Sequence, residues 1–226
     1  MDWTAAIDGY CERTDASFWS EPVNAFTNVA FLLAAAIMWR RTAGRRTPVQ
    51  GVLIALLFAI GVGSALFHTF AAPWAALADV LPIALFVLAY VYAANRHFWR
   101  LPAWAALLGT GAFVPYAAAA TPVFAALPGF AVSAMYWPVA LLIALYGAAL
   151  LGRAPATGRG LLLGAAILTL SLAARSADEA LCAVVPLGTH WLWHLLNGAM
   201  LGWMIEVHRR HLSGRGGPLE GRAAAR

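Results

Sequence analysis

The chain has 226 residues, of which 62% are hydrophobic and only 11% are charged. Soluble domains carry about 25% charged residues, so most of this apolar surface cannot face water. A water-soluble globular fold is therefore excluded, and a lipid bilayer is the expected environment. The formal net charge of +5 comes from arginines in short gaps between apolar runs, which is typical of membrane topology and not of nucleic-acid binding.

The apolar residues are grouped into runs of membrane-spanning length. A bilayer core about 30 Å thick needs about 20 apolar residues per helix. The sequence contains seven such runs, at 22–39, 50–70, 76–94, 102–120, 130–151, 160–180 and 187–207. Because backbone amides cannot stay unpaired in lipid, each run is expected to be a helix. The predicted fold class is an all-α membrane protein, a bundle of seven transmembrane helices.

The arginines predict the orientation of this bundle. Thirteen of the fifteen lie in the odd-to-even connections or after the last run, which is one side of a seven-helix topology. The positive-inside rule places that side in the cytoplasm and the N-terminus outside. We therefore expect an extracytoplasmic acidic arm over 1–21, a seven-transmembrane domain over 22–208 and a basic cytoplasmic tail over 209–226.

The few strongly polar side chains inside the runs gather toward the outer side. Ser64 and His68 are four residues apart in the second run and share one helix face. His190 and His194 have the same spacing in the seventh run. Asp79 opens the third run, again at its outer end. Since polar groups in hydrocarbon are costly, we expect the three histidines and the carboxylate to converge.

Three imidazoles with an open fourth position form the ligand set of a catalytic zinc site. Haem ligation is the main alternative interpretation, but it would leave Ser64 and Asp79 without a role. The remaining histidines are expected to be interfacial or hydrogen-bonded groups: His97, His208 and His211.

The segment before the first run is rich in carboxylates, among them Asp8, Glu12, Asp15 and Glu21. Carboxylates at this density repel one another unless they are solvated or bound to a hard cation. Calcium takes about six to eight oxygen ligands from such groups and from backbone carbonyls. A solvated acidic arm and a calcium site are equally good interpretations of this composition.

The two cysteines, Cys11 and Cys182, both fall on the outer side of the predicted topology. In an oxidising periplasm they can join the arm to the start of the last run as a disulfide. The alternative is a pair of free, buried thiols, because separation in sequence does not establish proximity in space.

Taken in chain order, these motifs resemble the alkaline ceramidase family. That family belongs to a wider group of seven-helix membrane hydrolases that includes the adiponectin and progestin receptors. The resemblance spans nearly the whole chain and rests on D-x-x-C-E from Asp8, E-P-x-N from Glu21, S-x-x-x-H from Ser64, the acid Asp79, and H-x-x-x-H from His190. The Ala- and Arg-rich, Lys-free composition indicates a bacterial member, expected in the inner membrane with its active site toward the periplasm.

The resemblance implies a zinc-dependent amidase that hydrolyses the N-acyl bond of ceramide or a related N-acyl lipid. The products would be a fatty acid and a sphingoid or amino lipid. His68, His190 and His194 would be the zinc ligands. Asp79 would orient or deprotonate the attacking water, and Ser64 would steady the water or the oxyanion.

Two alternatives to an amidase remain open at this point. One is a seven-transmembrane lipid receptor or structural protein with a non-catalytic metal. The other is a lipid esterase of the same superfamily.

The resemblance also implies a calcium ion held by the arm near the zinc site, and a disulfide between Cys11 and Cys182. The calcium ligands that it transfers to this sequence are Asp8, the Tyr10 carbonyl, Glu12, Thr14 or Asp15 as alternatives, and Glu21.

Arg175 lies near the outer end of the sixth run, close in sequence to Asp178 and Glu179. Recognition of a lipid headgroup is one interpretation of this arginine. We expect instead an internal ion pair with one of the two acids, which would stabilise the helix end.

Overall fold

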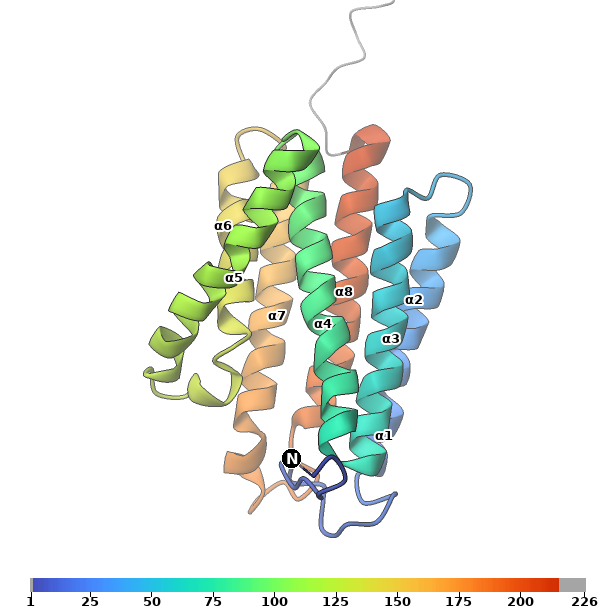
Figure 1. Ribbon diagram of the computed structural model, residues 1–226, viewed down its shortest axis with the longest axis vertical. Helices are drawn as coiled ribbons and strands as arrows, with labels where there is room; N and C mark the ends of the chain where they lie inside the picture. The colour runs from blue at the N-terminus through green and yellow to red at the C-terminus, as the bar shows by residue number, and fades with distance from the viewer. Residues whose placement is uncertain (1, 216–226) are drawn as a thin grey trace, which may run out of the picture.

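The computed structural model describes residues 2–215. They form a bundle of helices along one axis, with the N-terminal arm folded across one end (Figure 1). In chain order the α-helices are α1 Pro22–Thr27, α2 Val29–Arg41, α3 Pro48–Phe70, α4 Pro73–Ala93, α5 Ala103–Ala125, α6 Trp137–Leu150, α7 Pro155–Leu181 and α8 His190–Arg210. The short helical turns are η1 Ala94–Phe98, η2 Ala131–Ser133 and η3 His211–Arg215. No β-strand occurs within residues 2–215, so the all-α prediction is confirmed for them.

Five helical segments are long and apolar enough to cross a bilayer, which makes this a membrane protein. These segments are Pro22–Arg41, Pro48–Phe70, Pro73–Phe98, Ala103–Ala125 and Pro155–Leu181. Helix α6 is apolar but has only 14 residues. Helix α8 is not among the five, and its last turns carry Glu206 and two arginines. Each of the seven expected runs contains a helix, and five of these helices meet the length and composition of a membrane span.

Prolines set most helix starts, and the helices around residues 115–137 differ from the predicted boundaries. Pro occupies the first turn of α1, α3, α4, α6 and α7, where its missing N–H is not needed. Helix α5 continues through Pro115 and Pro122 to Ala125, beyond the expected end at 120. The next run was expected to begin at 130, but residues 131–133 form only the single turn η2 and α6 begins at Trp137.

Helices α3 and α4 are in close contact at Gly63. A Cβ atom at this position would overlap the carbonyl of Ala78 and lie 3.1 Å from the backbone nitrogen of Asp79. Only a residue without a side chain lets the two backbones approach this closely. Because Ser64 and Asp79 are adjacent to this contact in sequence, the glycine sets the separation of the two side chains.

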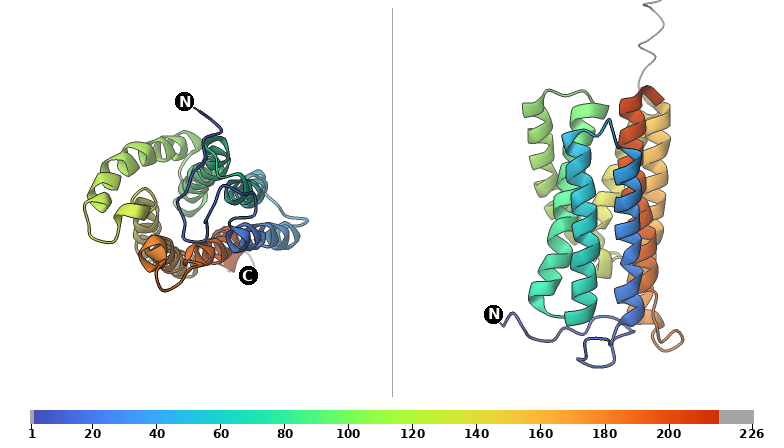
Figure 2. Two further views of the ribbon diagram at one scale, coloured as in Figure 1. Left: turned by 90° about the horizontal axis from the view of Figure 1, so that it is seen from below. Right: turned by 90° about the vertical axis from the view of Figure 1, so that its right-hand side faces the viewer.

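The helices differ greatly in how deeply they are buried. Helix α8 is lined with buried residues from His190 to His208 and carries two of the candidate ligands into the interior. Helix α5 contributes a single buried residue, Ala106. Seen along the bundle axis, α5 lies on the rim and stands apart from the other helices (Figure 2). The metal-binding candidates therefore lie on central helices, and the helix most exposed to lipid is α5.

Replacement of Gly63 by Ala is expected to lower the thermal unfolding midpoint. An added methyl group at a tight helix contact costs about 1–3 kcal/mol, because the two backbones must separate. Gly111→Ala in α5 is the matched control, since no atom lies within 4 Å of its Cβ position. The unfolding midpoints of the two variants are measured on the detergent-solubilised proteins. Equal midpoints for the two variants would contradict the assigned role of Gly63.

Candidate metal centre

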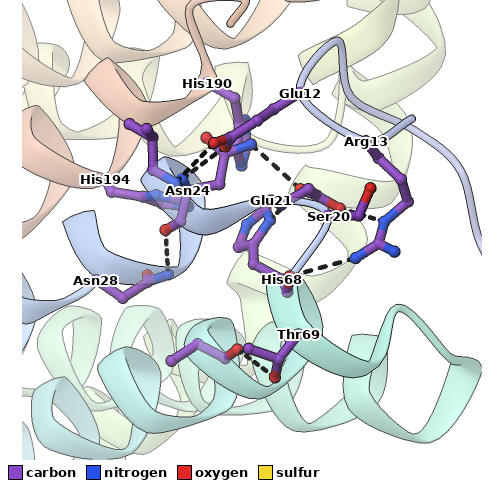
Figure 3. A network of polar contacts seen from close by, with 12 residues as sticks. Glu12, Arg13, Ser20, Glu21, Asn24, Asn28, His68, Thr69, His190 and His194 are labelled. Atoms are coloured by element: carbon purple, nitrogen blue, oxygen red, sulfur yellow. Dashed lines mark hydrogen bonds and ion pairs between the residues drawn. The ribbon is translucent and has the colours of Figure 1, made fainter. Parts of the chain in front are cut away.

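Three histidines meet at the end of the bundle that the arm covers (Figure 3). His68 lies in the last turn of α3, and His190 and His194 lie in the first two turns of α8. One ring nitrogen from each lies within 4.8 Å of the others. All three side chains are buried, with at most 2% of each residue exposed. Among residues 2–215 this is the group of His, Cys, Asp and Glu side chains whose geometry suits a metal ion.

The hydrogen bonding of the three rings fits a bound metal. Each ring has one buried nitrogen without a hydrogen-bond partner: Nε2 of His68, Nδ1 of His190 and Nε2 of His194. A buried polar atom left unpaired costs about 1–3 kcal/mol, so an unpartnered nitrogen on each of three neighbouring rings favours a bound ligand. Neutral imidazole nitrogens are ligands for zinc and related transition metals. The residues present therefore fit the zinc ion implied by the sequence resemblance.

Glu21 fixes the tautomer of His68. Its Oε2 lies 2.6 Å from Nδ1 of His68 and 3.2 Å from the side-chain nitrogen of Asn24, and its Oε1 lies 2.5 Å from Nε of Arg13. Burial raises the pKa of the Glu21 carboxyl, but these hydrogen bonds outweigh burial and hold its pKa below the usual value. An ionised carboxylate only accepts, so Nδ1 of His68 donates and Nε2 keeps its lone pair for a metal.

Thr27 has the same role for His194, and no motif in the sequence marks it. The Thr27 hydroxyl donates its proton to the carbonyl of Val23 over 2.8 Å. Its oxygen therefore accepts from Nδ1 of His194, which is 2.9 Å away. This hydrogen bond leaves Nε2 of His194 free. The ring of His190 is held differently, because it stacks on Tyr10 of the arm with 3.8 Å between the ring centroids.

The two predicted catalytic groups lie beside the histidines. Ser64 is buried one helical turn before His68, and its hydroxyl lies close to the carboxylate of Asp79 from α4. Asp79 also lies within electrostatic range of His68 and Arg175. The structure thus gathers a serine, an acid and three imidazoles from α3, α4 and α8 in one region.

The expected disulfide between Cys11 and Cys182 is present, with a Cα–Cα distance of 5.2 Å. Asp178 reinforces this junction. Its Oδ2 accepts from the backbone N–H of Cys11 at 3.0 Å, and its Oδ1 accepts from those of Thr189 and His190 at 2.6 and 2.8 Å. The carboxylate satisfies N–H groups at the start of α8 that have no partner within the helix. It therefore joins the arm, the end of α7 and the first zinc-ligand candidate of α8.

The expectation of an ion pair between Arg175 and Asp178 or Glu179 is therefore wrong for Asp178, whose two oxygens are engaged by backbone N–H groups. Arg175 Nη1 donates instead to the carbonyl of Val132 at 2.7 Å and to Oγ of Ser133 at 3.2 Å. Its guanidinium thereby links α7 to η2.

Two of the proposed calcium ligands, Glu12 and Glu21, are buried acids. Both oxygens of Glu12 accept backbone hydrogen bonds at the start of α1, from Val23 at 2.6 Å and Asn24 at 2.8 Å. Glu12 therefore acts as the N-terminal cap of this helix from a distance in sequence. Both oxygens of Glu21 are engaged as described above.

The other calcium candidates are also engaged or face solvent. The carbonyl of Tyr10 accepts from the backbone N–H of Arg13 at 3.1 Å. Asp8, Thr14 and Asp15 are exposed, and Oδ1 of Asp15 accepts from a neighbouring backbone N–H at 2.8 Å. Since the oxygens are already engaged and the charged groups do not converge, these residues do not fit a calcium site in this structure.

The remaining histidines are hydrogen-bonded, as expected, at the other end of the bundle. Nδ1 of His97 lies 2.9 Å from Nε2 of His208, and Nδ1 of His211 lies 2.8 Å from Oγ1 of Thr157. The expected basic tail lies outside the described residues from position 216 onward.

Thr27→Val is expected to weaken zinc binding about 10–100-fold, the usual effect of removing a group that orients a metal-bound histidine. Valine keeps the shape of the side chain and loses only the hydroxyl that holds Nδ1 of His194. Thr110→Val in α5 is the matched control, because its hydroxyl bonds only its own helix, at the Ala106 carbonyl. Competition with a chromophoric chelator measures the zinc affinity of each. An unchanged affinity in Thr27→Val would contradict this assignment.

Comparison with known proteins agrees with the geometry. The chain matches the protein family described as Ceramidase over residues 3–211. This match includes the arm, the disulfide, helices α1 to α8 and all of the candidate ligands. A search of curated proteins finds no match. The family match covers well over half of the chain, and the chain therefore belongs to the Ceramidase family.

Proposed function

We propose that the protein is a zinc-dependent amidase of the membrane that cleaves the N-acyl bond of ceramide or a related N-acyl lipid. Membership of the Ceramidase family implies a hydrolase that acts on amide bonds. One observation carries the zinc dependence: three buried histidines near one another, each with an unpartnered ring nitrogen. A purely structural histidine cluster would satisfy these nitrogens within the protein.

The residues around the histidines supply the other groups that amide hydrolysis needs. Zinc held by His68, His190 and His194 would provide a Lewis acid and lower the pKa of water. The Asp79 carboxylate takes the proton of the attacking water and delivers it to the nitrogen of the leaving amine. Ser64 lies close to the same carboxylate and would steady the attacking water or the oxyanion.

A small apolar cavity of about 60 Å³ near the metal centre is the proposed binding site of the acyl chain, which would push its lining apart on entry. It lies between α4, α6, α7 and α8, and its lining includes Trp193 and Asn197, which flank His194 on α8. Deeper residues of the lining are all apolar or aromatic, and include Ile83, Phe86, Leu168, Met200 and Met204. A hydrocarbon chain would be buried there while its amide group remains near the histidines.

A second apolar cavity gives a route to this one from the bilayer. It is bounded by α4, α5 and α6, and it shares Ile83, Val87, Tyr136 and Val139 with the first. Helix α5 forms the outer wall of this second cavity and has a single buried residue. We propose that the lipid substrate enters sideways, past α5, without leaving the membrane.

The proposed topology has seven membrane crossings, with the arm outside and the C-terminus in the cytoplasm. The metal centre lies at the arm end of the bundle, and the arginine-rich end lies opposite (Figure 1). There the buried Glu206 binds Arg41, Arg209 and Arg210 at 2.9, 2.7 and 2.7 Å. Three arginines thus share one carboxylate and keep a net positive charge at this end, which suits α8 as the last span, ending at the cytoplasmic surface. In a bacterial inner membrane the active site would face the periplasm.

Asp79→Asn is expected to lower the rate of amide hydrolysis about 10²–10⁴-fold, because an amide cannot accept the proton of the attacking water. Bound zinc should remain at the wild-type level. Asp2→Asn is the matched control, since Asp2 is exposed and bonds only Thr4. Mass spectrometry of products from a panel of N-acyl lipids and ester lipids measures the reaction. Ester cleavage without amide cleavage would support the esterase alternative, and zinc binding without any hydrolysis would support a receptor.

Ile83→Trp is expected to reduce kcat/KM for long-chain N-acyl substrates far more than for short-chain ones, because the indole would fill the proposed acyl cavity. Leu85→Trp is the matched control on the same helix, since Leu85 is 44% exposed and does not line the cavity. Rates measured over a series of acyl lengths give the comparison. An equal loss at every length in Ile83→Trp would contradict the assignment of the cavity.

A further inference from the structure

Arg13 is a buried cation at the junction of the arm and the bundle (Figure 3). Only 7% of the residue is exposed. Its guanidinium is surrounded by oxygen atoms: Oε1 of Glu21 at 2.5 Å, the carbonyl of His68 at 3.2 Å, and the arm carbonyls of Asp15 and Ser17 at 3.1 and 3.4 Å. One carboxylate and three carbonyls would equally suit a hard metal cation.

The arm is folded to present these carbonyls to Arg13. The hydroxyl oxygen of Ser20 accepts from the backbone N–H of Thr14 at 2.9 Å and of Asp15 at 3.1 Å. This closes the loop that contains Asp15 and Ser17. The loop thus wraps around an arginine that belongs to the same segment.

We propose that Arg13 is the built-in cation of the arm: its guanidinium takes the place of a divalent ion, so that the arm docks without calcium, and it holds Glu21 in the position that orients the zinc ligand His68. This role rests on the proposed zinc centre, but not on which bond the enzyme cleaves. Arg13 is a positioning residue, because it reaches the metal ligand through Glu21 and through a backbone carbonyl.

The charge balance explains why a cation is required here. A buried carboxylate is costly unless a positive group compensates it. Glu21 uses Oε2 to hold His68, which must be neutral to bind a metal. Its negative charge therefore needs another partner, and Arg13 supplies it at Oε1. With both oxygens fixed, the carboxylate cannot rotate away from the imidazole.

The statement that the arm docks without calcium is tested on the unmodified full-length protein, purified in detergent and loaded with zinc. Buffers are depleted of calcium on a chelating resin, and thermal unfolding is followed with and without millimolar CaCl₂. The unfolding midpoint should be the same in both, and equilibrium binding of radioactive calcium should show no stoichiometric site. A saturable rise of the midpoint with calcium, or one tightly bound calcium per chain, would overturn the proposal.

The role of Arg13 in positioning Glu21 and His68 is tested with Arg13→Gln and Arg13→Lys. Loss of the charge in Arg13→Gln should raise the zinc dissociation constant about 10–100-fold, as expected when the orientation of a ligand is lost. Arg13→Lys should give an intermediate value, because an ammonium group restores the charge but not the forked hydrogen bonds. The matched control is Arg153→Gln, an exposed arginine in the turn before α7. Zinc affinity is measured by chelator competition.

The outcomes separate positioning from plain stabilisation. Lower unfolding midpoints with unchanged zinc affinity would overturn the positioning role. If Arg13→Gln does not fold, the affinity of Arg13→Lys and the calcium titration of the wild type still decide the proposal. Neither measurement uses a substrate. A wild type that binds zinc and ignores calcium but cleaves no lipid amide would therefore refute the proposed function and leave this inference standing.

Discussion

The hydrogen bond between Glu21 and His68 connects the N-terminal arm to the metal centre. It fixes which nitrogen of the imidazole faces the other two histidines. It also places a negative charge where water is scarce, and this charge is stable only because Arg13 lies on its other side. The position of the arm, the start of α1 and the end of α3 therefore depend on one carboxylate. A change at any of them is transmitted to a metal ligand.

Buried polar groups also need partners at the second junction, which lies at the start of α8. The first turn of any helix has N–H groups without partners inside that helix. Here Asp178 satisfies two of them and also binds the backbone of Cys11, beside the disulfide to Cys182. Glu12 does the same for α1. Acidic residues that the sequence offered as metal ligands or ion-pair partners are thus used to cap helices, because helix ends near lipid have few other partners.

The parts of the site that could be predicted are those with a local signature. The spacing of four residues places Ser64 with His68, and His190 with His194, on single helix faces whatever the rest of the fold does. Thr27 and Asp178 could not be found in this way. Each is an ordinary polar residue whose role depends on a partner more than ten positions away, such as His194 for Thr27. The calcium ligands could not be judged from the sequence for the same reason, since an acidic composition does not reveal which oxygens are already bonded.

The sequence by itself determined that the chain is helical and embedded in lipid, since 62% hydrophobic residues in long runs leave no other way to satisfy the backbone. It also determined the chemical types available at the centre, because polar residues inside such runs are few. Only the tertiary structure decided how these groups are paired. Gly63 sets the distance between α3 and α4, Arg13 takes the place expected for a metal cation, and α5 stands away from the core. These are contacts between distant segments, and hydropathy and spacing describe each segment alone.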